Sequence, residues 1–203
     1  MLSIALLSVA LLGHSVARAG ESLAEEHRRH LAEFGWSERV GAGTAVWVSI
    51  DEQRFRIVEN GMVAWEAACA TARNGSGSEM DSLKTPLGWH VVARKTGNGE
   101  PWGRVFRGGK ATALIWKPGD DTREDLVLTR VLFLDGLEPG KNKGGKVDSM
   151  ARCIYIHGTN AEDRIGTPSS HGCIRLRNDD VIEAYDRIAE GTPVLITEKK
   201  TKE

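Results

Sequence analysis

The sequence predicts a mainly β domain, with β-sandwich-like mixed sheets and one short helix near the C-terminal end. Three observations support this fold class. From residue 44 onward, apolar and polar residues alternate over several short segments, as they do in half-buried strands. Stretches rich in glycine, asparagine and proline separate these segments as turns. One late segment, after residue 177, has the apolar spacing of an amphipathic helix instead.

The predicted elements follow one another as alternating strands and loops. Asn60-Gly61 lies between two strand-like runs and predicts a tight hairpin, because both central residues of such a turn need positive φ. The run 126–134 is almost continuously apolar, so we expect a central strand buried on both faces. Asn178 is the expected N-cap of the late helix. The remaining expectations are a short amphipathic helix at 21–36, strands at 44–50, 54–57, 89–94, 151–157 and 193–197, and loops at 72–84 and 136–146.

The first twenty residues have the features of a secretory signal. An apolar run from Leu2 to Leu12 is followed by the small-residue pattern Ala17 to Ala19, so we expect cleavage after Ala19. The run is too short to span a bilayer comfortably. No basic residue precedes it, so the alternatives are an uncleaved anchor or a true start further upstream. We expect a signal peptide at 1–19, a helical lead-in at 20–42 and one folded domain at 43–198, with no transmembrane segment after the signal.

Charge and length restrict the classes of function. The chain has 203 residues, which is enough for one domain with a hydrophobic core. It carries 27 basic and 28 acidic residues, and loss of the signal removes only Arg18, which leaves a net charge near −2 (26 against 28). Bulk charge therefore excludes a nucleic-acid binder.

Three cysteines give an exported protein an odd number of thiols. At least one of them is therefore free or bonded to another molecule. Cys69 and Cys153 either pair and leave Cys173 alone, or remain as two buried free thiols. The sequence does not choose between these alternatives.

The stretch 156–178 holds two His-Gly pairs with a cysteine directly after the second. Along the predicted strand, a period of two places Cys153, Tyr155 and His157 on one face, while the isoleucines between them face the core. His157 is then presented at the strand's end on an accessible face. The connection that follows is rich in turn residues, so the chain can fold back and bring Cys173 beside His157.

These residue types suit thiol chemistry. A cysteine with a pKa near 8.5 is only a few per cent thiolate at neutral pH, so a nucleophilic role needs a proton acceptor. His157 is the candidate base, and Gly158 allows a backbone carbonyl to approach and hold the imidazole tautomer. The turn from Ser170 to Cys173 offers backbone N–H groups for a developing oxyanion.

Two other interpretations of the same residues remain open. A single cysteine is commonly a small buried hydrophobe, and a histidine beside glycine is commonly a turn residue. Zinc needs four ligands, or three and a water molecule. His157, His171 and Cys173 supply at most three, and His90 would have to join them from a distant segment.

The motif itself resembles a known family. Ile156-His157-Gly158, followed by the run from Gly166 to Asn178 with its Ser-His-Gly-Cys core, resembles the signature of the L,D-transpeptidase catalytic domain (YkuD-like), of the Gram-negative type. Thr85-Pro86-Leu87-Gly88 and the loop 136–148 are also similar, so the likeness covers about 43–197. It implies the L,D-transpeptidase fold, with the short helix after the cysteine.

The resemblance assigns roles residue by residue. Cys173 matches the nucleophile and His157 the general base, which the carbonyl of Gly158 orients. His171 and Gly172 match the turn that, with Cys173, provides the oxyanion hole. For substrate binding, Ser170 matches the small hydroxyl position and Arg175 a position near the substrate. Tyr155 either lines the cleft or packs in the core. Lys141, Lys143 and Lys146 lie in a loop near the cleft, where they either attract substrate carboxylates or form a solvated surface.

The implied reaction is acyl transfer on peptidoglycan, in the periplasm. The thiolate would attack the stem tetrapeptide carbonyl before the terminal D-Ala and form a thioester. An amine acceptor on another stem then gives a 3→3 crosslink, water gives an L,D-carboxypeptidase, and a lysine of an envelope lipoprotein gives protein attachment. A noncatalytic cell-wall-binding module is the alternative from another class. No cofactor and no metal is implied, and the expected partners are peptidoglycan stem peptides.

Overall fold

The structure is a computed structural model that describes residues 22–122 and 124–198. The expected signal peptide, 1–19, lies outside these residues. Within them, no helix is long and apolar enough to cross a membrane. The α-helices are α1 (Leu23–Ala32), α2 (Trp36–Arg39) and α3 (Asn178–Arg187), and two short 3-10 helices are η1 (Gly145–Val147) and η2 (Glu162–Arg164). The strands are β1 (Thr44–Ser49), β2 (Arg54–Glu59), β3 (Met62–Ala68), β4 (Gly88–Thr96), β5 (Arg104–Arg107), β6 (Lys110–Ile115), β7 (Val127–Gly136), β8 (Tyr155–Gly158), β9 (Ile174–Leu176) and β10 (Pro193–Thr197).

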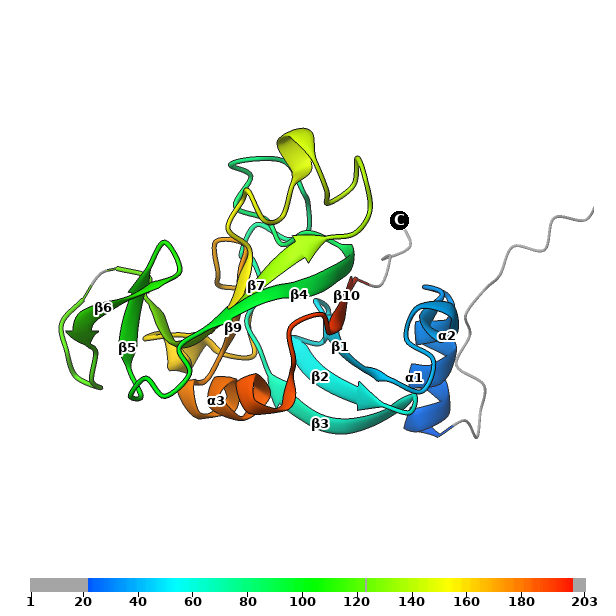
Figure 1. The fold of residues 1–203 in the computed structure, drawn as a ribbon, viewed down its shortest axis with the longest axis horizontal. Coiled ribbons are helices and arrows are strands. Elements are labelled where there is room, and N and C mark those ends of the chain that lie inside the picture. Colours follow the sequence, from blue (N-terminus) through cyan, green and yellow to red (C-terminus); the bar gives the residue numbers. More distant parts are fainter. Residues whose placement is uncertain (1–21, 123, 199–203) are drawn as a thin grey trace, which may run out of the picture.

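The strands form one mixed sheet that curves through the molecule (Figure 1). The order is β3-β2-β1-β10-β4-β7-β5-β6, and β8 leaves this path by pairing with β7 and β9. The pairs β1–β10 and β8–β9 are parallel, whereas the other pairs are antiparallel. The predicted class, mainly β with mixed sheets and a short helix after Cys173, is confirmed.

The main core lies between the curved sheet and α3 (Figure 1). Ile154 and Ile156 face this core as the alternation predicts, and Val181 and Tyr185 of α3 pack against the same cluster. The expected burial of β7 is also confirmed, because most of its residues are buried. β7 and β8 are thereby held rigidly beneath the helix.

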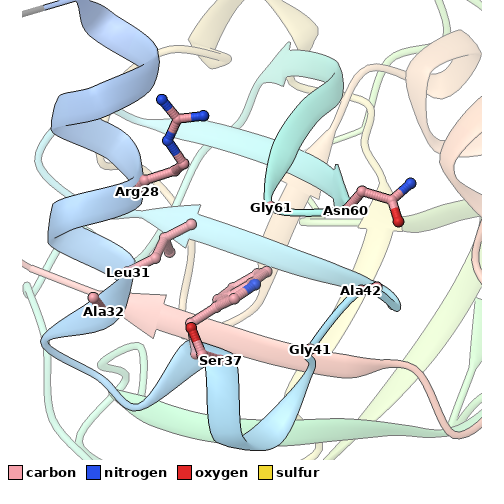
Figure 2. A pocket seen from close by; sticks show the side chains of 9 residues that line it. Arg28, Leu31, Ala32, Ser37, Gly41, Ala42, Asn60 and Gly61 are labelled. Atoms are coloured by element: carbon pink, nitrogen blue, oxygen red, sulfur yellow. The ribbon is translucent and has the colours of Figure 1, made fainter.

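The N-terminal lead-in forms two helices rather than one. α1 begins at a capping box, in which Ser22 and Glu25 bind each other's backbone amides. Gly35 adopts φ 67° and breaks the predicted single helix before α2. A pocket of about 370 Å³ lies between these helices and the β2–β3 turn, and its lining includes Arg28 and Asn60 (Figure 2). None of its lining residues belongs to the His-Gly-Cys stretch.

Two expectations about local structure are wrong. The strand predicted at 151–157 begins only at Tyr155, because the residues before it form a turn in which Cys153 adopts φ 57°. Asn178 is the first residue of α3 rather than its cap, which is Arg177. The side chain of Asn178 is buried and is used at the site described below.

Candidate active site

Strands β8 and β9 bring the segment that follows the second His-Gly pair beside the strand that carries the first. Their parallel register places His157 opposite Arg175, and Cys173 directly precedes β9. Since side chains alternate along each strand, Cys173 and Arg175 share a face with Tyr155 and His157. The connecting segment therefore folds back as expected and gathers these four side chains on one side of the strand pair.

His157 is buried, with 3% of its surface exposed, so the expectation of an accessible face is wrong. Its Nδ1 lies 2.7 Å from the carbonyl oxygen of Gly158. A carbonyl can only accept, so Nδ1 carries the proton and Nε2 keeps a free lone pair. Burial lowers the pKa of His157 to about 4, opposed by the Gly158 carbonyl and assisted by the charge of Arg175. The imidazole is therefore neutral at pH 7, in the tautomer that a general base needs.

Gly158 is required by close packing rather than by its backbone angles. A Cβ at this position would lie 2.4 Å from Oδ1 of Asn178 and 2.9 Å from the carbonyl of Leu128. Asn178 is itself fixed, because its Oδ1 accepts from the hydroxyl of Thr129 at 2.6 Å and its Nδ2 donates to the carbonyl of Thr159 at 2.8 Å. The start of α3 thus supports the peptide that orients His157.

The thiol of Cys173 is half-buried and faces main-chain atoms. Its Sγ donates to the carbonyl of Cys153 at 3.3 Å and accepts from the amide of Tyr155 at 3.4 Å. No hydrogen bond joins it to His157 in the part of the chain that the structure describes. Burial raises the pKa of Cys173 to about 11, although the Tyr155 amide and the charge of Arg175 lower it. The resting pair is therefore a neutral thiol and a neutral imidazole, not an ion pair.

Ser170 closes the turn that carries the cysteine. Its hydroxyl donates to the carbonyl of Cys173 at 2.6 Å and accepts from the amide of Gly172 at 3.1 Å. From the other side, Thr85 donates to the carbonyl of Gly172 at 2.9 Å. Gly172 has φ 129°, which other residues rarely adopt. Within the described chain, the amides of His171 and Cys173 have no hydrogen-bond acceptor, whereas that of Gly172 is occupied by Ser170.

The side chain of His171 links two charged groups beside the turn. Its Nε2 lies 2.9 Å from Nη2 of Arg73, and its Nδ1 lies 2.9 Å from Oδ2 of Asp125. Because arginine can only donate, Nε2 is the acceptor and Nδ1 carries the proton. His171 is thus held between a guanidinium and a carboxylate.

Asp125, like Arg73, is a residue of this site that the sequence does not indicate. It also pairs with the guanidinium of Arg175, which is 4% exposed. Asp125 lies at the end of a polar loop and belongs to no recognisable motif. No residue near Asp125 in the sequence indicates that it contacts His171 and Arg175, which lie 46 and 50 positions further along the chain.

Tyr155 contacts the thiol of Cys173 through its backbone rather than through its side chain. Its amide contacts the thiol, whereas its ring is buried and packs edge-to-face on Phe133 with centroids 4.6 Å apart. Burial raises the pKa of the Tyr155 hydroxyl, and contact with the Cys153 side chain raises it further. Of the two roles expected for this side chain, the geometry favours core packing.

The remaining sequence candidates lie apart from this cluster or are already paired. Lys141 pairs with Glu138 and Lys143 with Asp135, so two of the three loop lysines bind carboxylates of their own chain. His90 is buried and hydrogen-bonds the Gly88 carbonyl and the Ser149 hydroxyl, each at 3.0 Å. Among the described residues, no group of three or more metal-binding side chains is found.

All three cysteines are free thiols. Cys69 is buried in the core, whereas Cys153 is exposed in the turn before β8. The pairing of these two cysteines is therefore absent, and the alternative of two buried thiols is wrong for Cys153.

Comparison with known proteins finds relatives that are named as L,D-transpeptidases. The relative named "Probable L,D-transpeptidase ErfK/SrfK" from Salmonella typhimurium is 47% identical over 90 residues, which is 43% of this chain and 29% of that protein. Its namesake from Escherichia coli K12 is 47% identical over 95 residues, 46% of this chain and 31% of the relative. The match to these relatives thus spans under a third of their length.

Among solved structures, the chain is similar to an L,D-transpeptidase from Mycobacterium smegmatis, with a TM-score of 0.47 and 18% identity. That similarity covers 76% of this chain and 59% of the other. Residues 43–196 match the family model described as the L,D-transpeptidase catalytic domain. Since this match covers most of the sequence, the chain belongs to the L,D-transpeptidase catalytic domain family.

Proposed function

We propose that the protein is a cysteine-dependent peptidoglycan L,D-transpeptidase in which Cys173 is the nucleophile and His157 the general base. One observation carries the proposal: Cys173 shares a face with a buried, neutral His157 whose Nε2 lone pair is free. His90 is also buried and bound to a backbone carbonyl, but its Nε2 bonds the Ser149 hydroxyl, whereas Nε2 of His157 has no hydrogen-bond partner among the described residues and can accept a proton. The site of action we propose is the periplasm, with stem peptides as substrate.

The first half of the reaction forms a thioester. The Cys173 thiol turns away from the Cys153 carbonyl, and Nε2 of His157 takes its proton as Sγ attacks the carbonyl before the terminal D-Ala. The unoccupied amides of His171 and Cys173 donate to the oxyanion. Collapse breaks the peptide bond, and the imidazolium returns the proton to the leaving amine of D-Ala.

The second half transfers the acyl group. We propose an amine of a neighbouring stem as acceptor, which loses a proton to His157, attacks the thioester and releases the Cys173 thiolate. The product is a 3→3 crosslink. Water or a lipoprotein lysine at the same step would give stem trimming or protein attachment instead.

The test is incubation with a disaccharide-tetrapeptide, followed by mass spectrometry of protein and products. We expect D-Ala release, a transient adduct on Cys173 and a crosslinked dimer. A tripeptide product would identify water as the acceptor, and a protein adduct would identify a lysine. Cys173→Ala should abolish the adduct, whereas Cys153→Ser should retain it, because the thiol bonds the backbone carbonyl of Cys153, which serine keeps. A noncatalytic cell-wall-binding module would bind the muropeptide with neither D-Ala release nor adduct.

The role of His157 has its own test. The rate of Cys173 alkylation from pH 5 to 9 should depend on His157 near neutral pH, and His157→Ala should lower it. If the wild type and His157→Ala show the same dependence of alkylation rate on pH, His157 is not the general base.

A further inference from the structure

Arg73 is an exposed arginine fixed to the turn that carries Cys173. Its backbone amide donates to the carbonyl of Ser170 at 3.0 Å, and the preceding Ala72 forms an isolated bridge with Ser170. Its side chain donates through Nη2 to Nε2 of His171 at 2.9 Å. Two separate contacts therefore hold this residue in place beside the nucleophile.

The guanidinium of Arg73 has no carboxylate partner among the described residues. Several other arginines form ion pairs with carboxylates, including the nearby Arg175, whose partner is Asp125. Asp125 supplies one negative charge, whereas Arg73 and Arg175 supply two positive charges. Within this trio, one positive charge has no carboxylate partner among the described residues, and it lies on the exposed side chain of Arg73.

The orientation of that charge is fixed by hydrogen bonding. Asp125 accepts from Nδ1 of His171, which leaves Nε2 as the acceptor that holds Arg73. Only one of the five guanidinium hydrogens of Arg73 is used in this contact, so four remain for a ligand. A planar guanidinium with free donors matches a carboxylate in a bidentate pair.

We propose that Arg73 binds the terminal carboxylate of the donor stem peptide, with His171 and Asp125 as its positioning residues. The inference rests on the proposed function and names its substrate requirement: a donor that ends in a free carboxylate one residue beyond the attacked carbonyl. His171 lies two positions before Cys173, so their Cα atoms are at most about 7 Å apart. His171 and Arg175 also share the carboxylate of Asp125, and Arg175 lies on the face that carries Cys173 and His157, so the guanidinium that His171 holds lies on the thiol side of the turn.

The test compares two donors, a tetrapeptide stem with a free terminal carboxylate and the same stem with a terminal carboxamide. Wild-type protein should acylate Cys173 with a kcat/KM about 10- to 100-fold higher for the carboxylate donor. Arg73→Gln should lose this preference by lowering kcat/KM for the carboxylate donor only, chiefly through KM. Arg73→Lys should retain part of it. The preference of the wild type should also shrink at high salt, because an exposed ion pair is screened.

Arg187→Gln is the matched control, since Arg187 is an exposed arginine paired with Glu183 on α3. It should change neither donor's kcat/KM by more than about 2-fold. Equal use of the two donors by the wild type, or an equal loss for both donors in Arg73→Gln, would overturn the role of Arg73 and leave the proposed function standing.

Binding provides a second measurement that does not need turnover. In a Cys173→Ala background, Arg73→Gln should weaken binding of the carboxylate stem about 10-fold and leave binding of the carboxamide stem unchanged. If the wild type acylates with neither donor, the proposed function fails. Arg73 is then still tested, because equal binding of both stems in this background would refute it.

Discussion

The carboxylate of Asp125 pairs with the guanidinium of Arg175, an arginine with 4% of its surface exposed. A buried charge is costly without a counter-charge, so this pair holds the start of β9 in place. The two charges act in opposite directions on the nucleophile. Arg175 lowers the pKa of Cys173 and Asp125 raises it. Burial is the largest influence on the pKa of Cys173, and the balance between these two charges adjusts it further.

Asp125→Asn should lower the pKa of Cys173, because the charge of Arg175 then acts without opposition. The measurement is the rate of Cys173 alkylation against pH, whose midpoint should move to lower pH. Stability should fall by about 1–3 kcal/mol, because a buried charge loses its partner. Asp121→Asn, at an exposed aspartate in the same loop, should change neither quantity. An upward shift of the alkylation midpoint would contradict the electrostatic role given to Asp125.

Gly158→Ala should unfold or inactivate the protein, since the added Cβ would collide with Oδ1 of Asn178 and the carbonyl of Leu128. We expect a loss of about 2–4 kcal/mol in the free energy of unfolding, measured by urea denaturation. Gly140→Ala is the control, because Gly140 has φ 75° with no atom within 4 Å of the added Cβ. It should cost about 1–2 kcal/mol through backbone strain alone. Similar losses in both variants would show that close packing is not the reason for glycine at 158.

Local pattern predicted a large part of this fold. The alternation of Ile154 and Ile156 with polar residues placed the core face of β8 correctly, because period two is a property of the strand itself. The turn from Ser170 to Cys173 was also indicated by its residue types. These features depend on neighbours in the sequence.

The features that the sequence could not indicate depend on distant segments. His157 lies opposite Val131 of β7 and Arg175 of β9, on the face of the strands that points away from α3, so its burial depends on segments that are distant in the sequence. Asp125 joins His171 across 46 positions of the chain. The sequence predicts a strand at Cys153 because the residues there continue the alternating pattern. The backbone of Cys153 instead adopts positive φ and forms a turn.

Ser170→Ala should reduce kcat more than it raises KM. The variant loses the hydrogen bonds that fix the Cys173 carbonyl and the Gly172 amide, so the nucleophile is held less firmly. A small misplacement of reacting atoms costs about 10- to 100-fold in rate. Steady-state kinetics of D-Ala release measures the change. Ser169→Ala is the adjacent control: its hydroxyl is buried without a partner, so its removal should leave activity and stability unchanged or slightly improved.

The cysteines should differ in their order of labelling. In the native protein, an aromatic disulfide reagent should react first with the exposed Cys153 and then with the half-buried Cys173. Cys69 should react only after unfolding, because it is buried and burial raises its pKa to about 12. The denatured protein should give three thiols without prior reduction, as counted by absorbance. Fewer than three would reveal a disulfide.

Stability should fall as the pH drops below the unfolded-state pKa of histidine, about 6.5. Burial lowers the pKa of both His90 and His157 to about 4. Between these values the unfolded chain binds a proton on each histidine and the folded chain does not, so acid favours unfolding. Each group should reduce the free energy of unfolding by up to about 1.4 kcal/mol per pH unit in this window, and by nothing above it.

The contribution of His90 can be separated from that of other titrating groups. His90 lies away from the thiol, where it bonds the Gly88 carbonyl and the Ser149 hydroxyl. His90→Gln should lose some stability at pH 8 but become less sensitive to acid than the wild type. The difference between the two proteins should shrink by about 1 kcal/mol or more from pH 6.5 to pH 5, as measured by urea denaturation followed through tryptophan fluorescence. A constant difference across this range would mean that His90 is not held neutral by burial.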